Sequence, residues 1–244
     1  MRHEVDDTRL PDSAVRLKGV LSQDERRAGG RPAVVLFPDA RGIGDHAIDC
    51  AGRLAALGYV TLVADLYGDG TRARDMAQAM ELMNGLRSDA GRWRARARAA
   101  LDALAGQDGV DRSRLAAIGH CFGGSTALEL ARSGAPLAAI VSFHGGLASP
   151  RPDDARNIKA KVLVCHGAAD PLVPPAEVAA FETQMSRTSV DWQLHAYGGA
   201  VHGFTNPEAD AAGVPALAYN AAADRRSRNA MLALFEEVFW PLLP

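Results

Sequence analysis

Short runs of apolar residues alternate along this chain with segments of helical periodicity, and this alternation restricts the fold more than any other feature. An unbroken apolar run is typical of a strand buried on both faces of a sheet. The expected strands cover residues 33–37, 59–64, 115–118, 138–143, 161–165 and 190–197, and the expected helices cover 45–57, 71–106 in one or two pieces, 125–132, 175–186 and 220–239. Strands that alternate with helices pair in parallel through right-handed crossovers. The sequence therefore predicts an α/β fold with a mostly parallel central sheet of about seven or eight strands and helices on both faces.

The length of the chain and the spacing of these segments favour one domain. The 244 residues are enough for one large domain or two small ones. No internal repeat, low-complexity tract or long linker separates one part from another. We therefore expect residues 1–244 to form a single α/β domain.

Charge and hydropathy exclude several classes of protein. The 27 basic and 29 acidic side chains give a formal net charge of −2. We therefore expect the alternating arginines at Arg92, Arg94, Arg96 and Arg98 to form a solvated helix face, not a surface that binds nucleic acid. No apolar run approaches the roughly 20 residues of a membrane helix, and residues 1–11 lack the apolar core of a secretory signal. Three cysteines are too few for a disulfide scaffold and lack metal-ligand spacing. We expect a cytoplasmic enzyme, monomeric or homodimeric, that acts on a small molecule and binds neither nucleic acid nor membrane.

A glycine-rich turn at residues 119–124 carries the main functional signal. The segment Gly-His-Cys-Phe-Gly-Gly follows the expected strand 115–118 and precedes a helix, so it has the form of a nucleophile elbow. Such a tight turn needs glycines where side chains would collide with the neighbouring strand and helix. It presents Cys121 at a helix N-terminus, where the helix dipole favours a thiolate. The alternative is a buried structural cysteine beside an incidental glycine turn, which the order of strand, elbow and helix disfavours.

An elbow of this kind predicts two partners further along the chain, an acid and then a histidine. Asp170 follows the strand 161–165, and His202 follows the strand 190–197 between glycines. The catalytic loops of α/β sheets lie beyond the carboxyl ends of the strands, so the three positions can meet at one edge. An aspartate before a proline also begins turns, and each partner taken alone is a weak indication. In this order, Cys121, Asp170 and His202 form a candidate nucleophile, acid and base.

The remaining histidines and cysteines fit no such set. His120 belongs to the elbow and is expected to point into the packing beneath it, while His144 and His166 follow strands and could line the pocket or cap loops. Cys50 and Cys165 have no comparable setting and are expected to be inert buried residues. The histidines expected at the surface or in loops are His3, His46 and His195.

Several segments together resemble the dienelactone hydrolase family of α/β-hydrolases. Besides the elbow, they are Pro38-Asp39, Asp65-Leu66-Tyr67-Gly68, the residues from Gly167 to Pro174 and the residues from Gly199 to Phe204. The resemblance extends from about residue 15 to the end of the chain. It implies the α/β-hydrolase fold and a triad of Cys121, His202 and Asp170. Such a triad requires no metal or organic cofactor.

The resemblance also implies roles for residues near the elbow. Asp39 stands where the family typically has a glutamate that holds the resting cysteine. Ala40 and Phe122 match the positions whose backbone N–H groups form the oxyanion hole. A competing role for Asp39 is to end the strand after Pro38 as a simple turn residue.

The residues that would bind a substrate carboxylate depart from the family pattern. The dienelactone enzymes hold this carboxylate with arginines, and the neutral Asn206 stands at one of those positions. Arg72 or Arg74 could replace the other arginine, and Arg41, beside the oxyanion loop, is a further candidate for binding an anion. The loss of one arginine predicts that uncharged esters are better substrates than dienelactones that carry a carboxylate.

The chemistry of these residues predicts a hydrolase of activated carboxylic esters or lactones. A thiolate at Cys121 would attack the carbonyl carbon and form an acyl-enzyme, which water activated by His202 would then hydrolyse. Phosphotriester hydrolysis at the same triad is the alternative, because an oxyanion hole can also polarise a phosphoryl oxygen. A thiol redox protein lacks support, since no resolving cysteine is near in the sequence, and a non-catalytic binding protein would not need all three residues.

Overall fold

The computed structural model describes residues 2–7, 15–24, 26 and 29–240 and divides into two compact units, Met1–Ile118 and Gly119–Pro244. Among the described residues, eight strands follow one another in the sheet in the order β1-β2-β4-β3-β5-β6-β7-β8. This strand order confirms the predicted α/β architecture. The single domain over residues 1–244 stays a prediction.

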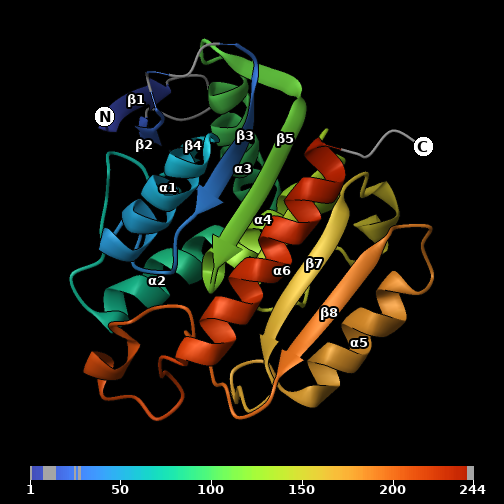
Figure 1. The fold of residues 1–244 in the computed structure, drawn as a ribbon. Coiled ribbons are helices and arrows are strands. Elements are labelled where there is room, and N and C mark those ends of the chain that lie inside the picture. Colours follow the sequence, from blue (N-terminus) through green and yellow to red (C-terminus); the bar gives the residue numbers. More distant parts are fainter. Residues whose placement is uncertain (1, 8–14, 25, 27–28, 241–244) are drawn as a thin grey trace. The chain divides into compact units, whose positions relative to one another are not determined.

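The first unit is built on two parallel strands, β3 (Arg31–Phe37) and β4 (Val60–Val63), with Ala33 opposite Val60. Every residue of β3 is buried, as expected of a parallel strand that is covered on both faces. In Figure 1, α1 lies in front of these strands and α3 lies behind them. The remaining elements of this unit are α1 (Asp45–Leu57), α2 (Met76–Arg87), α3 (Ala90–Ala105) and most of β5 (Val110–His120).

Two N-terminal strands were not predicted from the sequence. β1 (Arg2–Asp7) pairs antiparallel with β2 (Leu17–Ser22), and β2 pairs antiparallel with β4. The sequence of β1, Arg-His-Glu-Val-Asp-Asp, has no apolar pattern, so its strand conformation depends on backbone pairing with β2. Hydrophobic periodicity does not report on pairing of that kind.

The second unit carries three parallel strands, and the loops that follow them leave from one edge. In register, β6 pairs with β7 and β7 pairs with β8, so His144, Asp170 and His202 all lie just beyond carboxyl ends of strands. Figure 1 shows α6 in front of these strands and α4 behind them. The elements are α4 (Phe122–Arg132), β6 (Ala139–Phe143), β7 (Lys161–Gly167), α5 (Pro175–Met185), β8 (Trp192–Tyr197), α6 (Ala221–Phe239) and the short 3₁₀ helices Pro152–Asn157 and Ala209–Ala212.

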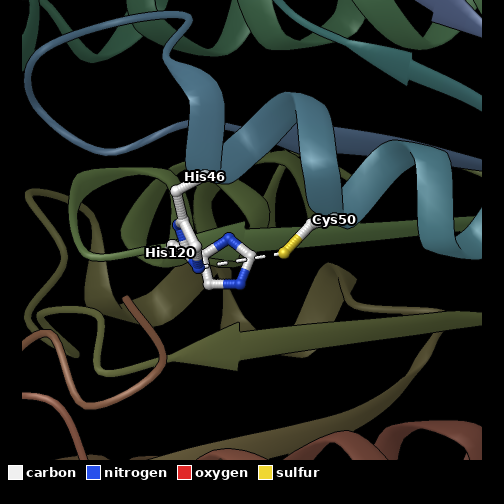
Figure 2. A group of neighbouring side chains, drawn as sticks. All are labelled: His46, Cys50 and His120. Atoms are coloured by element: carbon white, nitrogen blue, oxygen red, sulfur yellow. Dashed lines mark hydrogen bonds between the residues drawn. The ribbon is translucent and has the colours of Figure 1, made fainter. Parts of the chain in front are cut away.

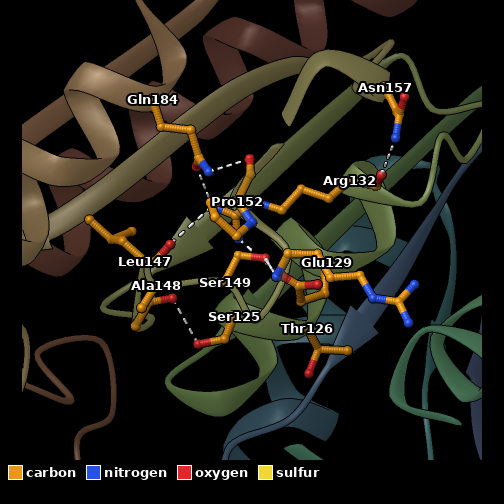
Figure 3. A network of polar contacts seen from close by, with 12 residues as sticks. Ser125, Thr126, Glu129, Arg132, Leu147, Ala148, Ser149, Pro152, Asn157 and Gln184 are labelled. Atoms are coloured by element: carbon orange, nitrogen blue, oxygen red, sulfur yellow. Dashed lines mark hydrogen bonds and ion pairs between the residues drawn. The ribbon is translucent and has the colours of Figure 1, made fainter. Parts of the chain in front are cut away.

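A buried ion pair in α4 fixes the loop after β6 (Figure 3). The guanidinium of Arg132 lies 3.0 Å from the carboxylate of Glu129, and both side chains are inaccessible to solvent. The same guanidinium donates hydrogen bonds to the Leu147 carbonyl oxygen at 3.0 Å and to Gln184 Oε1 at 2.9 Å. Because a buried charge is costly unless it is fully paired, this network holds α4, α5 and the loop in one arrangement.

No helix among the described residues is both long enough and apolar enough to cross a lipid bilayer.

Candidate active site

The elbow places Cys121 in a strained backbone conformation between β5 and α4. Its φ and ψ angles are 55° and −119°, a region that residues with a Cβ rarely adopt. A Cβ atom on Gly119 would lie 2.0 Å from the Gly123 carbonyl oxygen, and a Cβ on Gly124 would lie 2.6 Å from Ser142 Oγ. The glycines are therefore required by close packing. The helix begins at Phe122 and not at residue 125 as predicted, because Gly123 and Gly124 belong to its first turn.

Asp170 and His202 form a buried hydrogen-bonded pair in the same unit. The Nδ1–H group of His202 donates to Asp170 Oδ2 over 2.8 Å, and both residues are buried. The other carboxylate oxygen, Oδ1, accepts the backbone N–H of Leu172 at 2.8 Å, so the carboxylate is held from two sides. This contact directs Nε2, the second ring nitrogen of His202, away from Asp170.

The environment of His202 favours its protonated form. Burial alone would lower the pKa of the imidazole, but the charge of Cys121 and the hydrogen bond to Asp170 raise the pKa to about 10. Opposite charges close to a histidine stabilise its cationic state. At neutral pH the imidazole of His202 therefore carries a proton.

Three further histidines of the second unit have different surroundings. His120 is buried and its ring stacks on Phe143 with 4.9 Å between ring centroids, so the prediction that it points into the packing is confirmed. His144 accepts the backbone N–H of Cys121 on Nδ1 at 3.2 Å. His166 is buried, and burial lowers the pKa of its imidazole.

In the first unit, hydrogen bonds hold the segment around Ala40, the expected oxyanion residue. Both polar groups of the peptide between Ala40 and Arg41 have a partner. The carboxylate of Asp39 accepts the N–H of Arg41 at 2.8 Å, and the Asp39 carbonyl oxygen accepts the N–H of Gly42 at 3.0 Å. The hydroxyl of Tyr67 donates to the carbonyl oxygen of Ala40 at 2.9 Å. Asp39 thus makes the turn contact that the simpler of its two predicted roles requires, and Tyr67 is a contact that sequence reasoning missed.

Two buried charged residues fix the loop that carries Tyr67. The Asp65 carboxylate accepts four backbone N–H groups at 2.8–3.1 Å, those of Lys18, Tyr67, Gly68 and Gly70. Arg96 donates to the carbonyl oxygens of Leu66 at 2.6 Å and Tyr67 at 3.1 Å, and burial lowers the pKa of its guanidinium. The prediction of a solvated arginine face was therefore wrong at Arg96, because carbonyl groups far along the chain take up its charge.

The four candidate anion-binding residues are three exposed arginines and a turn asparagine. Arg41, Arg72 and Arg74 are exposed, and the Nε atom of Arg74 lies 3.6 Å from the Asp75 carboxylate. Asn206 is half-buried, and its Oδ1 accepts the N–H of Glu208 at 3.0 Å, so this side chain shapes a turn. Substrate binding by these four residues stays a prediction.

The two other cysteines do not share one environment. Cys165 is fully buried, and burial raises the pKa of its thiol to about 12, which confirms the prediction of an inert residue. Cys50 is half-buried, so the prediction of a buried residue was wrong there. Its sulfur lies 3.8 Å from Nε2 of His46, one turn earlier on α1, as Figure 2 shows. The guanidinium of Arg53 lies 2.9 Å from the same sulfur.

The mostly parallel sheet and the strained elbow at the start of α4 define an α/β-hydrolase fold. The model of the dienelactone hydrolase family matches residues 17–239, and the chain belongs to this family. The family is one of ester and lactone hydrolases, so the expectation of a hydrolase that acts on ester bonds is confirmed.

Solved structures and curated proteins agree with this assignment. A protein named m3DLH is 52% identical, with a TM-score of 0.93 and 98% of each chain covered. A dienelactone hydrolase-like promiscuous phosphotriesterase from metagenomic libraries is 50% identical, again with a TM-score of 0.93 and 98% of each chain covered. A putative carboxymethylenebutenolidase from Yersinia pestis is 26% identical over 81% of this chain and 78% of its own length.

Proposed function

We propose that this protein hydrolyses activated, uncharged carboxylic esters and lactones through an acyl-enzyme on Cys121. The observation that carries the proposal is the buried His202–Asp170 pair, hydrogen-bonded at 2.8 Å, in the unit that also presents a strained cysteine at a helix N-terminus. Membership of the dienelactone hydrolase family supports the reaction class. The triad assigns Cys121 as nucleophile, His202 as acid and base, and Asp170 as the group that orients His202.

In the first half of the reaction, the thiolate of Cys121 attacks the carbonyl carbon and forms a C–S bond. The carbonyl π electrons move to oxygen, and the backbone N–H groups of Phe122 and Ala40 stabilise the oxyanion. Phe122 suits this role because it begins α4, and a helix directs its first N–H groups outward. When the tetrahedral intermediate collapses, the alcohol leaves and takes a proton from the His202 imidazolium.

In the second half, the same histidine must become a base. The charge of Cys121 is among the causes that raise the pKa of His202. Acylation makes the sulfur neutral and removes this cause, so the pKa of His202 falls and the imidazole can accept a proton from water. The resulting hydroxide attacks the thioester carbonyl, and the thiolate leaves. The state of the cysteine thus switches His202 between its two roles.

The residue at position 206 supports a preference for uncharged substrates. An arginine at this position could pair with a substrate carboxylate, whereas Asn206 is neutral and its Oδ1 already accepts the N–H of Glu208. The exposed residues Arg41, Arg72 and Arg74 are the remaining candidates for binding a carboxylate. Loss of one charge-assisted contact of roughly 1.5–3 kcal/mol would weaken binding of carboxylate-bearing dienelactones by about 10- to 100-fold.

A second candidate function is the hydrolysis of phosphotriesters at the same residues. The 50% identical relative is described as a promiscuous phosphotriesterase, and it covers 98% of the chain. In this reaction the thiolate would attack phosphorus, expel an aryloxide and leave a dialkylphosphoryl group on the sulfur. Hydrolysis of that group would need the same base, His202.

A substrate panel tests both proposals together. Initial rates would be measured for aryl esters, simple lactones, a carboxylate-bearing enol lactone and an aryl phosphotriester, with wild type, Cys121→Ala and the control Cys50→Ala. We expect the highest kcat/KM for uncharged aryl esters, and a loss of about 10³-fold or more in Cys121→Ala. Full activity in Cys121→Ala would refute the nucleophile. A higher kcat/KM for the charged enol lactone than for the uncharged esters would refute the substrate preference.

A further inference from the structure

His144 has a positive φ angle, a backbone conformation that is common only for glycine. Among the described residues, only Asp69, Cys121 and His144 combine a side chain with a positive φ, and the value at His144 is 40°. Its own N–H donates to the Cys165 carbonyl oxygen at 2.8 Å, which holds the backbone in place directly after β6. Strained residues of this kind persist where the surrounding structure enforces them, often at functional sites. Two of the three, Cys121 and His144, are hydrogen-bonded to each other.

The hydrogen bonds of the His144 ring determine its protonation state. Nδ1 accepts the backbone N–H of Cys121 at 3.2 Å, and a backbone N–H can only donate. Nδ1 therefore carries no proton, the ring is neutral, and the proton resides on Nε2. Nε2 lies 2.9 Å from Thr205 Oγ1, so the Nε2–H group donates to this hydroxyl.

The same ring also lies against the loop of the proposed base. The His144 and His202 rings are 5.2 Å apart between centroids and meet edge to face, and the Phe204 ring lies 5.1 Å away in a similar orientation. His144 is buried, and Thr205 is three residues after His202. One buried imidazole thus joins the backbone of the proposed nucleophile to the loop that carries the proposed base.

We propose that His144 is a positioning residue for the hydrolase reaction, a neutral imidazole that sets the distance between the Cys121 sulfur and the His202 ring. The inference rests on the proposed function of Cys121 and His202. The N–H of Cys121 is also accepted by the Phe143 carbonyl oxygen at 3.0 Å, so it is occupied by two acceptors. This occupation is consistent with Phe122, and not Cys121, supplying the oxyanion N–H from the elbow.

Three variants separate this role from simple packing. His144→Phe keeps a flat ring but removes both hydrogen bonds. His144→Asn keeps an acceptor near the position of Nδ1, tolerates a positive φ and loses the contact with Thr205. Thr205→Val keeps the shape of its side chain and removes only the second contact. His195→Asn is the matched control, because His195 is half-buried on β8 and its ring contacts Gln193 at 3.2 Å.

The kinetic readout is the separation of kcat from KM on a neutral aryl ester. For His144→Phe we expect kcat to fall by about 10- to 100-fold with KM changed by less than about threefold, because misplaced reacting groups slow the chemical step. We expect His144→Asn to recover most of this loss and Thr205→Val to lose about 3- to 10-fold in kcat. The double variant His144→Asn/Thr205→Val should be no slower than His144→Asn, because both remove the same contact. The control should match wild type.

Two results would overturn the inference. One is wild-type kcat in both His144→Phe and Thr205→Val, and the other is a His144→Asn variant as slow as His144→Phe. If His144→Phe does not fold, the kcat of Thr205→Val decides, since an unchanged value contradicts the role. Cys121→Ala is assayed in parallel. Activity retained in Cys121→Ala would refute the proposed function itself, whereas an inactive Cys121→Ala with unaffected His144 and Thr205 variants would refute only the role of His144.

Discussion

The Nδ1 atom of His202 lies 2.8 Å from the Oδ2 atom of Asp170, and both side chains are almost completely shielded from solvent. The carboxylate has a second contact, to the N–H of Leu172, so it cannot rotate away without losing two hydrogen bonds. When His202 is neutral, this geometry selects the tautomer whose Nε2 atom can accept a proton from the proposed nucleophile.

Asp170→Asn tests that selection without changing the shape of the side chain. An amide can donate to Nδ1 and stabilise the wrong tautomer, and it provides no charge for the imidazolium. We expect kcat on an aryl ester to fall by about 10²- to 10⁴-fold with little change in KM. Asp210→Asn is the control, because Asp210 is an exposed residue of the 3₁₀ helix Ala209–Ala212. Equal kcat values for wild type and Asp170→Asn would remove Asp170 from the mechanism.

The pKa of His202 should depend on the sulfur of Cys121. The charge of Cys121 is among the causes that raise this pKa to about 10, so Cys121→Ala should lower it. Histidine NMR titration of wild type, Cys121→Ala and His202→Gln would assign the resonance and follow the shift. An unchanged pKa in Cys121→Ala would contradict the switch between acid and base.

The same shift predicts how stability depends on pH. The folded pKa of His202 is raised above the 6.5 of an unfolded histidine, so the folded state binds the proton more tightly. The resulting stabilisation is complete below about pH 6.5 and is lost as the pH rises through about 10. Denaturant titrations over this range should show an unfolding free energy that decreases with pH more steeply in wild type than in His202→Gln. Identical slopes would contradict the raised pKa.

Tyr67→Phe tests whether the Ala40 segment needs its side-chain support. The hydroxyl of Tyr67 donates to the Ala40 carbonyl oxygen, and the Asp39 carboxylate holds the next N–H group. Without the hydroxyl, the peptide group between Ala40 and Arg41 can rotate, and the adjoining N–H of Ala40, the proposed oxyanion donor, is less well placed. We expect kcat to fall by about 10-fold with a nearly constant KM. Tyr219→Phe, which removes a contact to Asp224, is the control, and an equal effect of both variants would show that Tyr67 has no specific role.

Asp39→Asn distinguishes the two predicted roles of Asp39. As a turn residue, an asparagine would still accept the N–H of Arg41 through Oδ1, so little should change. As the partner of the resting cysteine, the carboxylate would disfavour the thiolate, and its removal should make Cys121 react faster with iodoacetamide near neutral pH. Alkylation of the Cys121 peptide would be followed by mass spectrometry. Equal alkylation rates and equal kcat would leave only the turn role.

Local patterns predicted those parts of the fold that depend on local physics. Helix α1 has the predicted bounds because Gly58 ends it with a φ of 106°, and the elbow glycines are required by atoms a few residues away. Arg96 could not be predicted in the same way, because the carbonyl group that binds it at 2.6 Å belongs to Leu66, 30 residues earlier. The hydrogen-bond partners of His144 are 23 and 61 residues away in the sequence, so neither contact could be predicted from local patterns.

Two further residues of the candidate site, Tyr67 and Thr205, lie in segments that the sequence analysis had singled out. Tyr67 belongs to the Asp-Leu-Tyr-Gly segment that carried part of the family resemblance, but its hydroxyl partner depends on the placement of the loop around Asp65. Thr205 follows directly on His-Gly-Phe, the segment that identified His202. In both cases the residue type was visible, and only tertiary packing shows what it binds.

The proposed mechanism requires an acyl group on Cys121, and this intermediate can be trapped. Wild-type protein would be mixed with an activated acetyl ester, quenched in acid within the first turnover and digested for mass spectrometry. For wild type we predict the mass of one acetyl group on the peptide that contains Cys121. We predict a stronger signal for His202→Gln after a long incubation with the ester, and no signal for Cys121→Ala. Turnover of the ester with no acetyl group on Cys121 at any quench time, or with the acetyl group on another residue, would refute Cys121 as the nucleophile.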